Sequence, residues 1–160
     1  MCEKNMEAEA KSVLAKATKS GCEIILPFDV VVTQELKENA AYEVVDSQTI
    51  PATHSAIDIG PKSIAYIGEK LKLCRTVIWN GPLGVFEIKP FDNGTNAVAR
   101  MVAERTKSGE CISIAGGGDT VAALENAGAA DRFSYISTAG GAFLEWLEGH
   151  ELPGVKALLK

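Results

Sequence analysis

The stretch Ile112-Ser113-Ile114-Ala115-Gly116-Gly117-Gly118-Asp119-Thr120 decides the fold of this 160-residue chain. It runs from a short strand rich in β-branched residues, through three consecutive glycines, into a sequence with helical character. Glycine lets the backbone turn sharply and come close to a ligand, and the first turn of a helix offers free N–H groups and a partial positive charge. A strand–loop–helix junction of this kind is suited to binding anions, above all phosphates.

A second junction, Tyr135-Ile136-Ser137-Thr138-Ala139-Gly140-Gly141-Ala142, follows about twenty residues later. Two junctions so close together predict neighbouring strands whose loops face one ligand. For this second loop the alternative is a tight turn that only packs strand against helix. The first loop is not a Walker A motif or a dinucleotide-binding fingerprint, because the required Lys-Ser/Thr and G-x-G-x-x-G patterns are absent, and a glycine run alone is a weak signal.

Outward from these loops, short apolar runs alternate with helical patterns. Strands are expected at residues 23–26, 30–33, 42–45, 56–59 and 76–79, and helices at 3–20, for about ten residues from Pro61, at 93–106 and after Pro153. Gly21 is expected to end the first helix. Alternating strands and helices favour parallel pairing with right-handed crossovers, hence an α/β layered fold in one domain over residues 1–160. Ligands of such sheets bind at the carboxyl ends of the strands.

The composition restricts the possible partners. A net charge of −5 without any cluster of Lys and Arg argues against nucleic acid. No apolar run reaches the length of a membrane span and no signal-peptide pattern opens the sequence, so a cytosolic location is expected. Cys2, Cys22, Cys74 and Cys111 are scattered and are interpreted as small buried thiols, while His54 and His150 lack partners at metal-ligand spacing.

Two acids have alternative interpretations. Asp119 could coordinate Mg²⁺ held by a polyphosphate, since hard cations prefer carboxylate and phosphate oxygens, or it could merely cap the following helix. The spacing does not decide between the two. Asp58, in Asp58-Ile59-Gly60-Pro61, is favoured by its spacing as a cap of the helix that starts near Pro61 rather than as a group pointing into the cleft.

The segment Trp79-Asn80-Gly81-Pro82-Leu83-Gly84-Val85-Phe86-Glu87 combines an amide, glycines, apolar residues and a carboxylate. This mixture suits the wall of a nucleoside site, with apolar contacts for a base and an acid for ribose hydroxyls. Each residue also has a plainer explanation. Trp79 and Phe86 are expected in the core, and Glu87 could be a solvated surface acid.

Taken together, these motifs resemble phosphoglycerate kinase in order and spacing. The similarity also includes Leu26-Pro27-Phe28-Asp29-Val30-Val31 and the ending Leu144-Glu145-Trp146-Leu147-Glu148-Gly149, and it extends from about residue 6 onward. It covers the C-terminal two-fifths of that enzyme. The resemblance implies a Rossmann-like three-layer parallel sheet with helices on both faces, incomplete relative to the family. The N-terminal domain that binds 3-phosphoglycerate and the lysine-bearing first part of the nucleotide domain are absent.

The resemblance assigns site roles position by position. The adenine site matches Ala56, Ile57, Pro82 and Val85, with Ala56 at a position where the family commonly has glycine. Glu87 matches the acid that binds the ribose hydroxyls. The polyphosphate region matches Asn80, Gly117, Gly118 and Thr120, and Asp119 matches the residue that meets nucleotide-bound Mg²⁺. The helix start facing the transferring phosphoryl group matches Gly140 and Gly141. Ala139 departs from the family, replacing the first glycine of T-G-G-G-A.

The implied activity is reversible phosphoryl transfer between 1,3-bisphosphoglycerate and ADP, giving 3-phosphoglycerate and ATP in glycolysis, with ATP or ADP and Mg²⁺ at the site. This chain is expected to supply most of the MgADP/MgATP site and to be inactive, or nearly so, alone. 3-Phosphoglycerate is expected to bind only when the missing N-terminal domain is present. The alternative is a non-catalytic nucleotide- or phosphate-binding fragment.

Overall fold

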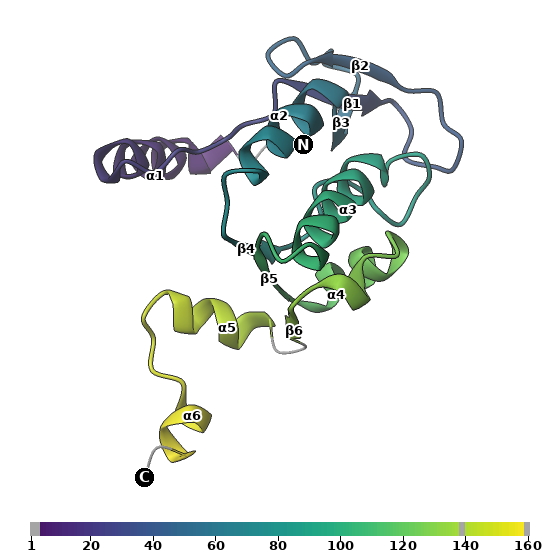
Figure 1. Ribbon diagram of the computed structural model, residues 1–160. Coiled ribbons are helices and arrows are strands. Elements are labelled where there is room, and N and C mark those ends of the chain that lie inside the picture. The colour runs from purple at the N-terminus through teal and green to yellow at the C-terminus, as the bar shows by residue number, and fades with distance from the viewer. Residues whose placement is uncertain (1–3, 138–139, 159–160) are drawn as a thin grey trace.

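The computed structural model describes residues 4–137 and 140–158, which form two small sheets and the helices that flank them (Figure 1). The α/β class is therefore confirmed. The elements in chain order are η1 (Lys4–Met6), α1 (Glu7–Ser20), β1 (Asp29–Thr33), β2 (Glu43–Asp46), β3 (Ser55–Ile59), α2 (Pro61–Leu71), β4 (Thr76–Asn80), α3 (Asn93–Lys107), β5 (Ile112–Gly116), α4 (Gly118–Asn126), η2 (Ala130–Arg132), β6 (Tyr135–Ser137), α5 (Gly140–Leu147) and α6 (Pro153–Leu158).

The second sheet contains the glycine-rich junctions, and its strands β4, β5 and β6 are parallel, as the alternating pattern predicts. Helices α3, α4 and α5 all contact β5, and in Figure 1 α5 lies on the opposite side of the strands from α3. The register aligns Asn80 with Gly116, and Gly116 with Ser137. Because these residues end their strands, the three following loops start from one row at the carboxyl edge.

The first sheet has the order β2-β1-β3 and is antiparallel throughout, so the expectation of a single parallel sheet is wrong for these strands. The reason lies in the connections. Parallel neighbours need a crossover of a dozen or more residues, usually a helix, whereas short loops join antiparallel strands. The segments between β1 and β2 and between β2 and β3 contain no helix.

The strand expected at residues 23–26 is also absent, since residues 22–28 connect α1 to β1 without regular structure. Ile24 and Ile25 are each 38% exposed, and Leu26 is 62% exposed. A strand is stable only beside a neighbour that pairs with its backbone, and no described strand runs along this segment. The residues have the composition of a strand, but they lack a partner.

The main core lies between α3 and the parallel sheet. The inner face of α3 carries Val98, Ala99, Val102 and Ala103, all buried, where the two alanines let the helix approach the strands closely. Trp79 from β4 is 7% exposed and meets Phe133 edge to face, with 6.2 Å between ring centroids. Its predicted core position is confirmed, whereas Phe86 is only half-buried. A smaller cluster is formed by Ala40, Ile57 and Phe91.

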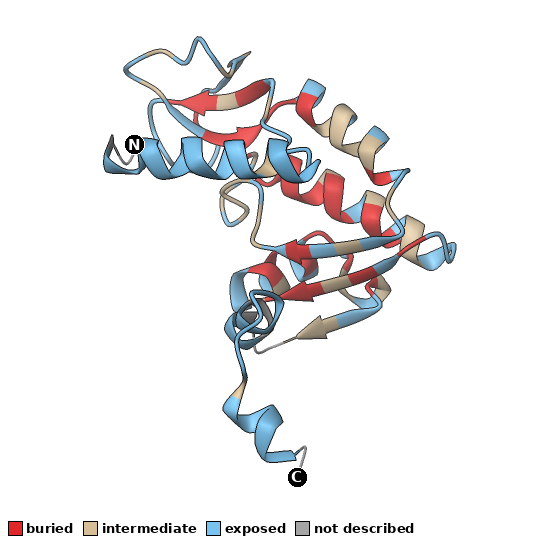
Figure 2. Ribbon diagram, turned by 90° about the vertical axis from the view of Figure 1, so that its left-hand side faces the viewer, coloured by how far each residue is buried: buried red, intermediate tan, exposed pale blue. Residues whose placement is uncertain are grey.

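Helix α1 extends away from the rest of the described chain (Figure 1) and has no buried residue (Figure 2). Gly21 ends it in the left-handed conformation, at φ 72°, as expected from the sequence. Val13 and Leu14 are 50% and 42% exposed, so the predicted apolar face has no covering element among the described residues. Cys22 is exposed, which contradicts its interpretation as a buried thiol.

Candidate functional site at the carboxyl edge of the parallel sheet

The glycine loop after β5 has the backbone geometry that an anion site requires. Gly117 has φ +101°, a conformation that residues with a side chain rarely adopt, and Gly118 opens α4. A Cβ built on Gly118 would meet nothing within 4 Å, so the space above this backbone is open. The N–H groups of the first turn of a helix have no partner within the helix, so those at the start of α4 are donors that a ligand could use.

Asp119 stands in the first turn of α4 with an exposed side chain. Its carboxylate makes no hydrogen bond or ion pair with the described residues, and the N-cap position is held by Gly117. The interpretation of Asp119 as a mere cap therefore finds no support. In residues 4–137 and 140–158, no group of three or more His, Cys, Asp or Glu residues could hold a metal, so a cation at Asp119 would need ligands from elsewhere.

Thr120 joins the glycine loop to the loop that follows β4. Thr120 is 2% exposed, and its hydroxyl accepts a hydrogen bond from the Gly81 N–H at 2.7 Å. The Trp79 indole Nε1–H donates to the Gly81 carbonyl, also at 2.7 Å. Gly81 has φ +92°, and both of its backbone polar groups are satisfied by side chains. The two loops are thus fixed relative to each other.

The residues assigned to the adenine site come together. An open pocket of about 390 Å³ has a mainly apolar lining: Pro27, Val30, Ala56, Ile57, Asp58, Ile59, Pro82, Leu83, Gly84 and Val85. The Val85 N–H donates to the Ile57 carbonyl at 2.9 Å, which attaches the loop after β4 to β3. Two other hollows, of about 310 Å³ beside Tyr42 and about 660 Å³ beside Tyr66, are lined by none of the predicted site residues.

None of the remaining predicted residues lines this pocket. Asn80 lines a separate hollow of about 260 Å³ along β4, and Glu87 is exposed farther along the same loop. Gly140 opens α5, and a Cβ built on Gly141 would meet nothing within 4 Å. Thr138 and Ala139 lie outside the described residues.

Asp58 does not cap α2, contrary to the sequence-based expectation. Asp29 from β1 does so, because its carboxylate accepts hydrogen bonds from the N–H of Lys62 (3.0 Å) and of Ser63 (2.8 Å). Gly60 lies so close to this carboxylate that a Cβ there would come within 3.0 Å of it. Although burial raises the pKa of Asp29, hydrogen bonds from the Ser63 hydroxyl and from the Lys62 and Ser63 N–H groups bring it below its ordinary value.

Asp58 instead holds the start of α3. One carboxylate oxygen accepts from the Gly94 N–H at 2.7 Å, and the other accepts from the Ile59 N–H at 2.8 Å. Burial raises the pKa of Asp58 to about 6, and the charge of Asp92 acts in the same direction, against the lowering effect of the two N–H donors. Thr95 also belongs to this region: its hydroxyl accepts hydrogen bonds from the N–H groups of Leu83 and Gly84. Nothing in the sequence singled it out beyond a Gly-Thr pair at a helix start.

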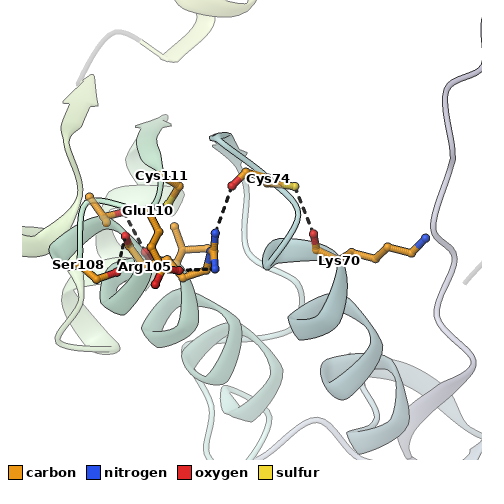
Figure 3. A network of polar contacts seen from close by, with 8 residues as sticks. Lys70, Cys74, Arg105, Ser108, Glu110 and Cys111 are labelled. Atoms are coloured by element: carbon orange, nitrogen blue, oxygen red, sulfur yellow. Dashed lines mark hydrogen bonds and ion pairs between the residues drawn. The ribbon is translucent and has the colours of Figure 1, made fainter.

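At the opposite edge of the sheet, two cysteines belong to a structural network (Figure 3). Arg105 donates to Glu110 at 2.6 Å and to the Cys74 carbonyl at 3.3 Å. The Cys111 sulfur lies 3.5 Å from the Thr106 hydroxyl. This network ties the beginnings of β4 and β5 to α3. Cys111 is buried and Cys74 half-buried, which agrees with packing roles for these two thiols.

The fold and this site define an α/β protein in which glycine-rich loops and helix starts gather at the carboxyl edge of a parallel sheet. Comparison with known proteins gives the family. The family model described as "Phosphoglycerate kinase" matches residues 1–150, and the chain belongs to this family. Among the described residues, no helix is long and apolar enough to cross a membrane.

Individual relatives agree with the family match. The chain is 56% identical to "Phosphoglycerate kinase" of Rhodospirillum centenum and 58% identical to that of Cereibacter sphaeroides, in each case over 99% of this chain and 40% of the relative. A solved phosphoglycerate kinase structure from Coxiella burnetii superposes with a TM-score of 0.89 at 42% identity, over 97% of this chain and 39% of that one. One from Pyrococcus horikoshii gives 0.70 at 28% identity. The chain thus spans about two-fifths of the length of these proteins.

Proposed function

We propose that this chain supplies most of the MgADP/MgATP site of a phosphoglycerate kinase, the glycolytic enzyme expected in the cytoplasm. One observation carries the proposal: Asn80, Gly116 and Ser137 end three parallel strands in one row. The loop after β4, the glycine loop and the start of α5 therefore open toward the same side. Backbone N–H groups at two helix starts beside an apolar pocket suit a nucleotide, whose base is apolar and whose phosphates are anionic.

The nucleoside end is assigned to the pocket of about 390 Å³. Its apolar walls, with Ala56, Ile57, Pro82 and Val85, would contact the adenine ring, and Glu87 would bind the ribose hydroxyls. Ala56 is exposed at the pocket, so the methyl group that replaces the family's usual glycine is tolerated without a clash with the described residues. Carboxylates are suitable acceptors for the paired hydroxyls of a ribose.

The phosphate end is assigned to the N–H groups of Gly117 and Gly118, with the Asn80 amide nearby. Because the Thr120 hydroxyl is buried and bonded to Gly81, we assign to Thr120 a backbone contact and the task of fixing the loop. The partner-free carboxylate of Asp119 fits a Mg²⁺ ion, which would neutralise part of the phosphate charge. A hard cation with phosphate and water ligands needs only one or two protein carboxylates, consistent with a single acid here.

The reaction requires positioning rather than covalent chemistry by the protein. The bond between the phosphoryl phosphorus and the carboxylate oxygen of 1,3-bisphosphoglycerate breaks, and a bond to the terminal oxygen of ADP forms. The N–H groups of Gly140 and Gly141 at the start of α5 would face the oxygens of the transferring group, where negative charge is greatest. Gly141 has open space around it, as such an approach demands.

The chain alone is expected to turn over little or no substrate. We propose that residues 1–160 form part of a nucleotide-binding domain, with the acceptor site on a substrate domain outside this sequence, since the relatives are about two and a half times as long. Loss of one charge-assisted contact to a transferring phosphoryl group typically costs about 3 kcal/mol, or roughly a hundredfold in rate. Without the substrate domain, neither 1,3-bisphosphoglycerate nor 3-phosphoglycerate is held beside the nucleotide.

The test measures turnover of 1,3-bisphosphoglycerate with MgADP, using the chain alone and mixed with the N-terminal three-fifths of a relative, together with calorimetric titration of MgADP. We expect saturable MgADP binding by the chain and turnover only in the mixture. Binding without rescue would favour the alternative, a non-catalytic nucleotide- or phosphate-binding fragment. Absence of saturable binding would refute both functions.

A further inference from the structure

A single buried carboxylate on β3 lies against the loop after β4, which lines the nucleoside pocket, and against the first turn of α3. Asp58 lies on β3, is 4% exposed, and accepts the Gly94 N–H at the start of α3. A Cβ at Gly84, in the loop after β4, or at Gly94 would lie within 3.0 Å of the Asp58 carboxylate. The carboxylate therefore fills the space between the loop and the first turn of α3, and only glycine fits on either side of it.

The same first turn of α3 holds the loop directly. Thr95, which is fully buried, accepts hydrogen bonds from the Leu83 N–H at 3.0 Å and from the Gly84 N–H at 3.3 Å. Asp58 fixes this turn to β3, and the turn fixes the loop. The position of the pocket wall thus depends on a chain of contacts that begins at Asp58 and ends at the apolar residues Pro82 and Val85.

We infer that Asp58 is a positioning residue for the nucleoside site: its carboxylate locks the first turn of α3 to β3 and so keeps the Pro82–Val85 wall formed before a nucleotide arrives. The inference rests on the proposed function, and Asp58 itself need not touch the ligand. A wall that is already formed binds more tightly, because less conformational freedom is lost on binding.

The presence of a carboxylate at position 58, rather than an apolar side chain, indicates that Asp58 positions the first turn of α3. An apolar spacer of similar size would fill the gap without the free-energy cost of burying a carboxylate. What the carboxylate adds is an acceptor at each of two positions, one for the Gly94 N–H and one for the Ile59 N–H. Asparagine has the same shape, but its NH₂ group would face one of these donors and leave that bond unmade.

The experiment compares Asp58→Asn with the wild-type chain and with Asp131→Asn, an exposed acid in η2. Amide hydrogen exchange is measured in the ligand-free chain, MgADP affinity by calorimetry, and unfolding by urea. For Asp58→Asn we expect the amides of Leu83, Gly84 and Val85 to exchange at least tenfold faster, the β5 amides to be unchanged, and the MgADP Kd to rise about tenfold. Removal of the buried charge should offset the loss of one hydrogen bond, so the midpoint of urea unfolding at pH 7 should change little. Asp131→Asn should change none of these quantities.

Three results would overturn the inference. Unchanged exchange in the loop would show that Asp58 does not hold it. A parallel loss of stability and affinity, or a variant that does not fold, would make Asp58 an ordinary structural residue. Faster loop exchange with an unchanged Kd would show that the order of the Pro82–Val85 wall does not affect MgADP binding. If the wild-type chain bound no MgADP, the proposed function would fail, and the exchange rates alone would still decide whether Asp58 positions the loop.

Discussion

Asp58→Asn is expected to remove a specific pH dependence from the free energy of unfolding. The pKa of Asp58 is about 6 in the folded chain, against an ordinary value of 3.8. Between these values the folded state retains a proton that the unfolded state has lost. Stability contributed by this group is therefore fully present below pH 3.8 and is lost as the pH rises through 6. Asparagine does not titrate, so the variant lacks this loss.

The expected magnitude follows from the same two values. At about 1.4 kcal/mol for each pKa unit, the difference between 3.8 and about 6 corresponds to about 3 kcal/mol. The lowered pKa of Asp29 acts the opposite way, with its stability present above pH 3.8 and lost at lower pH, but this contribution is common to both proteins. Subtracting wild type from variant at each pH leaves the contribution of Asp58.

Urea unfolding, followed by tryptophan fluorescence at intervals from pH 4.5 to 7.5, measures this difference. We expect the free energy of unfolding of Asp58→Asn, minus that of wild type, to increase as the pH rises to about 6.5. Above that pH the difference should stay constant. Asp131→Asn should follow wild type throughout. A difference that stays constant with pH, or one that changes in the opposite direction, would refute the reasoning that burial raises this pKa.

Three further predictions concern other parts of the site and sheet. Thr120→Val leaves the Gly81 N–H without its acceptor and should destabilise the chain by about 1–3 kcal/mol, as judged from urea unfolding, while Thr120→Ser should retain most of the stability. Asp119→Asn should weaken ADP binding in the presence of Mg²⁺ but not in its absence, measured by calorimetry; an unchanged Mg²⁺ dependence would contradict the assigned role. Among the described residues, β4 has no strand on its second side, and Ile78 on this strand is 46% exposed. Ile78 should therefore promote self-association. The substitution Ile78→Lys should lower the sedimentation coefficient at high protein concentration.

Local signals were sufficient for the strand–loop–helix junctions. The glycines at 116–118 are adjacent in sequence to the strand before them and the helix after them, and the geometry of this junction depends mainly on the backbone freedom of glycine. The parallel pairing of β4, β5 and β6 followed from the helices between them. Ala56, Ile57, Pro82 and Val85 were grouped by the resemblance to phosphoglycerate kinase rather than by a local signal, and the structure places them around one pocket.

Contacts between distant segments could not be predicted in this way. Which acid caps α2 depends on the antiparallel pairing of β1 with β3, which brings Asp29 to Gly60 and leaves Asp58 for α3. Spacing along the chain favoured Asp58 as the cap, because it is nearer in sequence to the start of α2 than Asp29 is. The expected strand at residues 23–26 failed for a related reason: its composition is correct, but strand formation needs a second strand beside it.

In the proposed nucleotide site, the hydrogen bond between Thr120 and Gly81 would link recognition of the two ends of a nucleotide. A ligand that orders the phosphate loop would also order the backbone beside the pocket for the base. By thermodynamic reciprocity, a ligand that orders the backbone beside the pocket would favour phosphate binding by the same amount. Adenosine and inorganic tripolyphosphate, offered as separate molecules, should then each improve the binding of the other. The intact nucleotide would gain from both of its ends at once, so part of its affinity would come from a single threonine hydroxyl that it does not touch.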